Sequence, residues 1–87
     1  MDTKLTVLEL FGLRMKELRL AKGVSQEKLA LESGIARSYL GGVERGERNI
    51  AVLNIIKIAE ALNVEPYKLF EQPTPELIDS LKIKKLK

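Results

Sequence analysis

The sequence predicts an all-α fold, and two observations support that prediction. Apolar residues recur every three or four positions along most of the chain, which is the spacing of one face of an α-helix. Glycine, proline or capping residues separate these segments, whereas the alternating pattern typical of β-strands is absent. A length of 87 residues suffices for one domain with a modest core.

A first helix is expected from about Thr6 to Lys22, where Gly23 ends it. Its inward face would consist of four apolar residues at helical spacing: Val7, Phe11, Met15 and Leu18. Leu13 and Leu20 fall on the opposite face of this helix. They therefore need an apolar cover or remain exposed.

Two short helical segments joined by a glycine turn follow the first helix. The earlier segment is Ser25–Ser33, with Ser25 as its N-cap, and the later one runs from about Arg37 to Arg45. Gly34 lies between them, where a left-handed backbone costs glycine nothing. Two helices on a short turn with glycine are typical of a helix-turn-helix, whose second helix enters the major groove of DNA. A helical bundle with no role on DNA is the alternative.

A fourth helix is indicated by apolar residues at helical spacing: Leu53, Ile56, Ala59 and Leu62. Ile55 and Ile58 widen its apolar face. Ala51 stands where a capping oxygen is usual, so the start of this helix is expected to be weakly capped. Asn63 is a suitable residue for the C-terminal cap.

Prolines begin the last two elements. Pro66 starts a short fifth helix, Pro66–Phe70, because proline suits the first turn of a helix. Thr74 and Pro75 can begin a short C-terminal sixth helix, in which order is expected to fade after about Lys82. The break before this segment divides the chain into a domain of residues 1–71 and a short extension of residues 72–87.

Composition excludes several classes of chemistry. The chain has no Cys and no His, so neither a disulfide framework, a thiolate metal site nor a Ser-His or Cys-His catalytic pair is expected. No paired-carboxylate or phosphate-loop pattern occurs, and the sequence predicts no enzyme and no metal, cofactor or small-molecule site. No apolar run approaches membrane-spanning length, and the start of the chain lacks a signal-peptide layout. A cytoplasmic protein is therefore expected.

The charge of the chain is a weak indication of a nucleic-acid partner. Its net charge is only +3, so any affinity for DNA must come from the placement of charges. The C-terminal run KIKKLK has three interpretations: a solvated end, a nonspecific contact to DNA, or part of a partner-binding helix.

A set of residues falls on a known motif: Gln26, Leu29, Ala30, Gly34, Ile35, Leu40, Val43, Glu44, Gly46, Ile58, Ala59, Ala61, Leu62 and Val64. Through them the chain resembles the Cro/repressor-type helix-turn-helix family, also called the xenobiotic-response-element family, over roughly Phe11 to Phe70. The run from Arg37 to Asn49 is similar to the controller proteins of restriction–modification systems in particular. The resemblance implies a compact five-helix, repressor-like DNA-binding domain.

The polar residues of the helix-turn-helix have predicted roles on DNA. Gln26 opens the earlier helix, where its amide and the free N–H groups can meet a phosphate; a solvated side chain that helps to cap the helix is the alternative. Arg37 leads the recognition helix, and arginine binds guanine O6 and N7 in bidentate fashion; a contact to phosphate alone is the alternative. Gly41 and Gly42 allow a close approach to DNA or, at Gly42, to another backbone. The predicted DNA-binding residues are Gln26, Arg37, Ser38, Tyr39, Gly41, Gly42, Arg45, Arg48 and Asn49.

Several of these roles have alternatives. Tyr39 can pack at the edge of the core, donate to a phosphate or touch a thymine methyl group. Arg45 and Arg48 are expected to hold phosphates, and Asn49 either joins them or caps the approach to the fourth helix. Gly41 departs from the controller pattern, which has Ser at this position, so the operator of the relatives cannot be transferred to this chain.

The resemblance further implies an ion pair between Arg19 and Glu44 that bridges the first and third helices. Such a pair positions elements more than it stabilises them.

The function expected from these features is sequence-specific regulation of transcription by a homodimer that binds double-stranded DNA at a two-fold operator. The apolar residues predicted for the dimer interface are Val64, Tyr67, Leu69, Phe70, Leu77, Ile78 and Leu81, with the core of the monomer as their alternative place. The alternative function is an antitoxin-like module that binds a partner protein through its tail. A wrapping tail would be disordered in isolation, whereas a dimer helix would be ordered.

Overall fold

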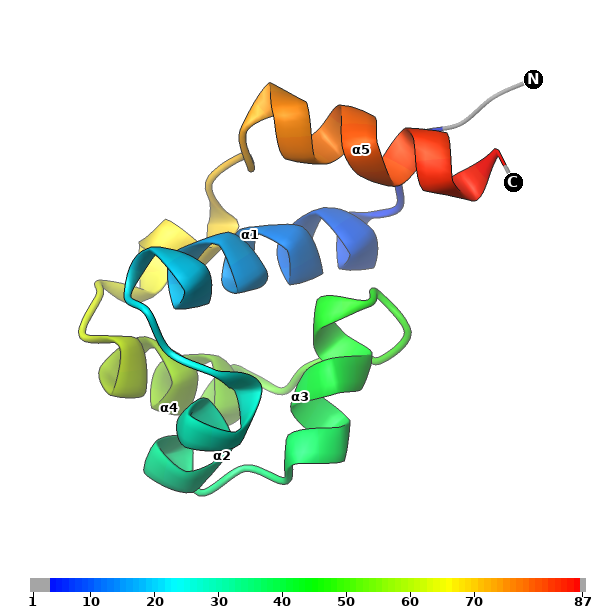
Figure 1. The fold of residues 1–87 in the computed structure, drawn as a ribbon. Helices are drawn as coiled ribbons and strands as arrows, with labels where there is room; N and C mark the ends of the chain where they lie inside the picture. Colours follow the sequence, from blue (N-terminus) through cyan, green and yellow to red (C-terminus); the bar gives the residue numbers. More distant parts are fainter. Residues whose placement is uncertain (1–3, 87) are drawn as a thin grey trace.

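The computed structural model describes residues 4–86, and this part of the chain is helical without a β-strand (Figure 1). The elements in chain order are α1 (Val7–Ala21), α2 (Gln26–Ser33), α3 (Arg37–Glu44), α4 (Val52–Leu62), the 3-10 helix η1 (Pro66–Phe70) and α5 (Pro75–Lys85). The predicted all-α fold is confirmed. The fifth helix is a 3-10 helix, and α5 continues beyond Lys82 to Lys85.

Local capping explains the start of α2 and the ends of α2 and α4, whereas Thr74 makes no side-chain cap at the start of α5. The Ser25 hydroxyl accepts a hydrogen bond from the Lys28 N–H at 3.1 Å, as expected of an N-cap. Gly34 and Asn63 end α2 and α4 in the left-handed conformation, with φ of 73° and 56°. Ala51 makes no side-chain cap, so the weak start predicted for α4 is confirmed.

The core lies between α1, α2, α3, α4 and η1. Its buried members come from all five elements and the turn before α3: Met15, Leu29, Ile35, Leu40, Val43, Ile55, Ile58, Ala59, Leu62 and Leu69. On α1, Met15 lies in this core and Phe11 and Leu18 pack against it, whereas Val7 is 80% exposed and the prediction for Val7 was wrong.

α1 and α3 approach each other through two glycines, Gly46, which the sequence places on the family motif, and Gly12, which the sequence reasoning did not single out. A Cβ atom added at Gly12 would lie 2.5 Å from the Glu44 carbonyl oxygen and would also overlap the Val43 carbonyl oxygen. Gly46, just after α3, has φ of 76°, and a Cβ there would lie 2.7 Å from the Cα of Glu9. The end of α3 therefore rests directly on the α1 backbone.

The inward face of α4 is rotated relative to the prediction. Ile55, Ile58, Ala59 and Leu62 are buried, whereas Leu53 is 74% exposed and Ile56 is 37% exposed. Eight of the eleven residues of α4 are apolar, so two overlapping stripes have helical spacing. The buried stripe has the regular i, i+3, i+4, i+7 pattern, and the stripe that begins at Leu53 is left partly uncovered.

α5 folds back along α1 in the opposite direction (Figure 1). The Thr74 N–H donates to Glu17 Oε2 at 3.3 Å near one end, and Lys85 Nζ lies 2.9 Å from Glu9 Oε1 near the other. The Thr6 backbone N–H and the Lys85 ammonium lower the pKa of the Glu9 carboxyl below its usual value. Leu13 and two leucines of α5 line one groove, whereas Leu20 stays 56% exposed. No helix within residues 4–86 is long and apolar enough to cross a membrane.

Candidate nucleic-acid interface

The start of α3 projects from the body of the protein, as a recognition helix requires. Leu29 of α2 and Leu40 of α3 are completely buried and fix the two helices to the core. Between them, the Gly34 and Ile35 N–H groups both donate to the Ala30 carbonyl, at 2.9 and 3.2 Å, which tightens the turn. Arg37 and Ser38 remain exposed in the first turn of α3. The structure therefore presents two of the predicted base-reading residues to solvent.

Arg37 is held by an acidic neighbour on α2. Its Nε donates to Glu27 Oε1 at 3.2 Å, and both side chains are exposed. The hydrogen bond from Arg37 lowers the pKa of the Glu27 carboxyl below its usual value. Exposed pairs of this kind contribute little to stability, so a DNA acceptor can replace Glu27 at small cost. Glu27 is a residue that the sequence reasoning missed.

The predicted pair of Arg19 and Glu44 is formed in bidentate geometry. Arg19 Nε lies 2.7 Å from Glu44 Oε2, and Arg19 Nη2 lies 3.0 Å from Glu44 Oε1. Arg19 Nη1 also donates to the Val24 carbonyl at 2.8 Å, and Gln26 Nε2 donates to Glu44 Oε1 at 2.9 Å. Both charged residues are buried. This network joins α1, the start of α2 and the end of α3, and so fixes the orientation of α3.

Gln26 is part of that network, which the sequence reasoning did not foresee. Its amide nitrogen donates to Glu44, and its side-chain oxygen would lie 3.6 Å from a Cβ added at Gly41. The side chain is thus held across the start of α2 and against α3. Its contact with a phosphate stays a prediction.

The glycine pair of α3 makes room for arginine side chains, not for another backbone. A Cβ at Gly42 would lie 2.7 Å from Arg48 Cγ, and a Cβ at Gly41 would lie 3.1 Å from Arg45 Nη1. The suggestion that Gly42 admits a second backbone was therefore wrong. Because α3 has no side chains at these positions, arginines from the following loop lie across its surface.

The two arginines differ in their partners. Arg45 Nε lies 3.1 Å from Glu47 Oε1, with both side chains exposed. Arg48 is exposed, and its guanidinium has no hydrogen bond or ion pair within residues 4–86. Arg48 is therefore available to a partner without breaking an existing contact.

Tyr39 and Asn49 are used within the protein. The Tyr39 hydroxyl donates to the Asn49 carbonyl at 2.8 Å, and the Tyr39 ring packs against the core. Asn49 Oδ1 accepts from the Ile50 N–H at 2.8 Å, which is the capping alternative for this residue. Tyr39 thus positions the loop between α3 and α4. To contact a phosphate through its hydroxyl, Tyr39 would first have to break its hydrogen bond to the Asn49 carbonyl.

The residues predicted for a dimer interface differ in how far the monomer itself buries them. Leu69 is completely buried in the core, and its assignment to the interface was wrong because the monomer does absorb it. Val64 packs against the core, and Leu77 and Leu81 line a groove with residues of α1 and α3 of the same chain. Ile78 is half-buried on α5. Tyr67 and Phe70 are mainly exposed, at 60% and 65%.

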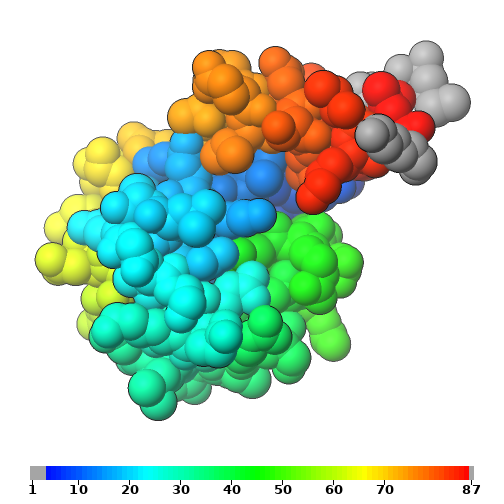
Figure 2. Space-filling view, viewed as in Figure 1, coloured from blue at the N-terminus to red at the C-terminus, as the bar shows by residue number. Residues whose placement is uncertain are grey.

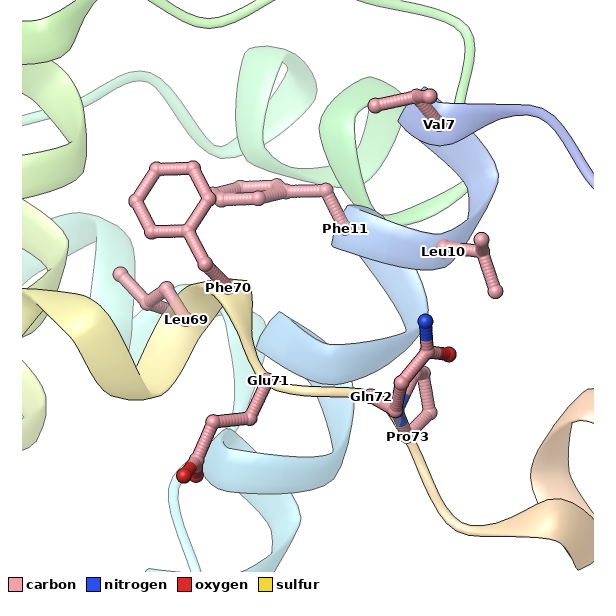
Figure 3. Close-up of a pocket in the computed structure, with 8 residues that line it drawn as sticks. All are labelled: Val7, Leu10, Phe11, Leu69, Phe70, Glu71, Gln72 and Pro73. Atoms are coloured by element: carbon pink, nitrogen blue, oxygen red, sulfur yellow. The ribbon is translucent and has the colours of Figure 1, made fainter.

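Phe70 borders a shallow pocket of about 250 Å³ between α1, η1 and the segment that follows η1 (Figure 3). Its ring lies 5.4 Å from that of Phe11, centre to centre, with the planes tilted by 60°. Val7 and Leu10 lie on the α1 side and Pro73 on the other. The exposed face of Phe70 therefore belongs to a wider apolar surface.

Comparison with known proteins shows the family to which this chain belongs. The family model described as helix-turn-helix matches residues 15–69. The chain belongs to the helix-turn-helix family. The control protein C.BamHI of Bacillus amyloliquefaciens is 46% identical over 66 residues, which are 75% of this chain and 82% of that protein.

Solved structures agree with this assignment. The restriction-modification controller protein C.AhdI from Aeromonas hydrophila is 60% identical, with a TM-score of 0.72 over 72% of this chain and 96% of that one. The biofilm regulator SinR, solved in complex with DNA and known from Bacillus subtilis, is 34% identical with a TM-score of 0.67 over 70% of this chain and 98% of that one. The protein is thus a transcriptional regulator with a helix-turn-helix DNA-binding domain.

Proposed function

We propose that this protein is a controller-type regulator that binds a two-fold operator as a homodimer, with one α3 in the major groove of each half-site. The observation that supports this most is the exposed start of α3, with Arg37 and Ser38 in solvent, on a helix fixed by the buried pair of Arg19 and Glu44. The similarity to C.BamHI and C.AhdI, a control and a controller protein, spans most of their length and supports the same role.

The test of this function is selection of bound duplexes from a random pool, followed by sequencing. The proposal expects an inverted repeat whose half-sites are about 34–36 Å apart, or one turn of DNA. Recovery of no preferred sequence, or of a single half-site without symmetry, would contradict the proposal.

Dimerisation is expected because a single module of this size buries little DNA surface and rarely achieves useful specificity. The face that we infer keeps two of the predicted residues, Tyr67 and Phe70, and replaces the others with residues of α4. α4 leaves Val52, Leu53 and Ile56 exposed, and η1, which packs against α4, leaves Tyr67 and Phe70 exposed. We place the two-fold contact on this surface of α4 and η1, because isolated proteins rarely leave so many large apolar side chains in solvent.

Leu53→Asp should therefore give a folded monomer that binds the selected operator far more weakly than the wild-type protein does. Leu53 is 74% exposed, so the fold loses little, whereas the charge cannot be buried in a dimer. Leu31→Asp is the matched control, because Leu31 is also a mainly exposed leucine, at 84%, and lies on α2. Sedimentation velocity gives the oligomeric state. A monomeric wild-type protein, or a Leu53→Asp variant that remains a dimer, would rule out this face.

Arg37→Ala should weaken operator binding by about 1–3 kcal/mol per half-site and relax the preference at one base pair. Arg37 leads α3, and its exposed pair with Glu27 can be exchanged for guanine. Arg48→Ala is the comparison: removal of a phosphate contact should weaken operator and random DNA alike and lower the salt slope by about one unit for each protomer bound. Fluorescence anisotropy titrations with the operator duplex and a random duplex distinguish a base contact from a phosphate contact. If Arg37→Ala weakens binding to both duplexes equally, Arg37 contacts phosphate and not a base.

The antitoxin-like alternative receives no support from the C-terminal segment. That alternative expects a tail without order in the isolated chain, whereas α5 is helical and packs along α1. The ordered α5 favours the regulator.

A further inference from the structure

The last helix brings its basic end next to the recognition helix. α1, the end of α3 and α5 enclose a groove of about 330 Å³, with Leu13, Leu77 and Leu81 among its lining residues. Three cationic side chains border the same groove, one from each element or its end: Lys16, Arg45 and Lys84. In Figure 2 the end of α5 stands over the end of α3, with the groove between them.

The position of this basic end is fixed by contacts that run through α1. Lys85 Nζ lies 2.9 Å from Glu9 Oε1, and the Glu9 backbone is the part of α1 on which Gly46 rests. Gly46 lies between Arg45 and Arg48, the two arginines that cover α3. The last turn of α5 is thereby placed beside the loop that follows the recognition helix.

The charges around the groove are not compensated within it. Within residues 4–86, Lys16 and Lys84 have no ion pair or hydrogen bond, and both are exposed. The acidic residue of the groove, Glu44, already binds Arg19 and Gln26. Glu47 pairs with Arg45, and Glu9 pairs with Lys85. Two free positive charges therefore remain at the border of the proposed DNA surface.

We propose that Lys16 and Lys84 form a second phosphate-binding strip, through which α1 and α5 hold the DNA backbone outside the base pairs read by α3. The inference rests on the proposed DNA binding and extends it to a surface outside the helix-turn-helix. The occupant is double-stranded DNA because the cations are exposed and spread over separate elements, as suits a row of phosphates. A small anion would require donors that converge on one point.

The experiment measures the salt dependence of binding to a duplex of random sequence, since phosphate contacts are independent of sequence. The variant is Lys16→Gln/Lys84→Gln. Both side chains are exposed, so circular dichroism should show an unchanged fold and melting temperature. Because neither glutamine can neutralise a phosphate, the slope of log Kobs against log salt should become shallower by about two units for each protomer bound.

Lys82→Gln is the matched control, because it removes the same charge from the same helix. Lys82 does not line the groove, and a separation of two residues places it roughly 200° around the helix from Lys84. Its salt slope should equal that of the wild-type protein. A double variant with the wild-type slope would overturn the inference. A loss in the Lys82 control that is half the loss in the double variant would also overturn it, because each removed charge would then count equally and bulk charge alone would explain the effect.

The same measurements separate this inference from the proposed function. If the double variant has a shallower salt slope but selection recovers no preferred sequence, the two-fold operator is contradicted and the phosphate-binding strip is supported. If selection recovers an operator and the double variant keeps the wild-type slope, the strip is contradicted and the operator is supported. A wild-type protein that binds neither duplex overturns both.

Discussion

Arg19→Ala should destabilise the protein by about 3–5 kcal/mol, which is a large share of the total stability of a domain of this size. Glu44 is buried, and its carboxylate accepts two bonds from Arg19 and one from Gln26. Removing Arg19 leaves a buried charge with only the Gln26 amide, and also leaves the Val24 carbonyl without its side-chain donor. Chemical denaturation of the purified variant measures the change in the free energy of unfolding.

Two further variants establish the cause. Lys28→Ala removes a lysine from an exposed pair with Glu32, at 3.7 Å, and should change the free energy of unfolding very little. Arg19→Met/Glu44→Leu removes both charges and should recover much of the stability lost in Arg19→Ala. A double variant as unstable as Arg19→Ala would show that packing, and not the stranded carboxylate, explains the loss.

Gly12→Ala should cost about 1–3 kcal/mol or more, although alanine is the better helix former. The new methyl group would overlap the Val43 and Glu44 carbonyl oxygens, so the backbones of α1 and α3 would have to separate. Since α3 carries the residues proposed to read DNA, operator affinity should fall together with stability. Thermal melting and anisotropy titration of the same preparation test both effects.

Gly42→Ala is the control, because it is the same substitution in the interior of a helix. Its methyl group would meet Arg48 Cγ at 2.7 Å, so Arg48 has to change its rotamer, but no backbone has to move. Stability should therefore fall less than in Gly12→Ala, whereas DNA binding should change because Arg48 is displaced. If Gly12→Ala proves as stable as Gly42→Ala, the close approach of α1 and α3 does not constrain the fold.

The parts of the fold that could be predicted from sequence depend on local chemistry. Ser25 and Gly34 fix the ends of α2 through bonds and dihedral angles within a few residues of themselves, and Asn63 does the same for α4. The pair of Arg19 and Glu44 was reached only through the resemblance to a family. It was then found in the structure with full bidentate geometry.

The parts that could not be predicted depend on which surfaces meet. α4 offers two apolar stripes, and only packing against the other helices selects the one with Ile58, so the sequence placed the exposed Leu53 on the same apolar face. The contacts of Arg37 with Glu27 and of Tyr39 with Asn49 join residues ten positions apart, across turns whose course the sequence does not specify. Gly12 is a glycine inside a predicted helix, which indicates a close approach, but the sequence does not indicate which element approaches it.

The glycine pair in α3 has a consequence for which side chains cover the proposed recognition helix. Arg45 and Arg48 cover the positions of Gly41 and Gly42 but belong to the segment that follows the helix. Substitutions of these two arginines would change the charge along one side of α3 and leave the buried contacts of Leu40 and Val43 as they are. The residue proposed to read bases, Arg37, belongs to α3 itself, so base preference and affinity for the DNA backbone would depend on different parts of the chain.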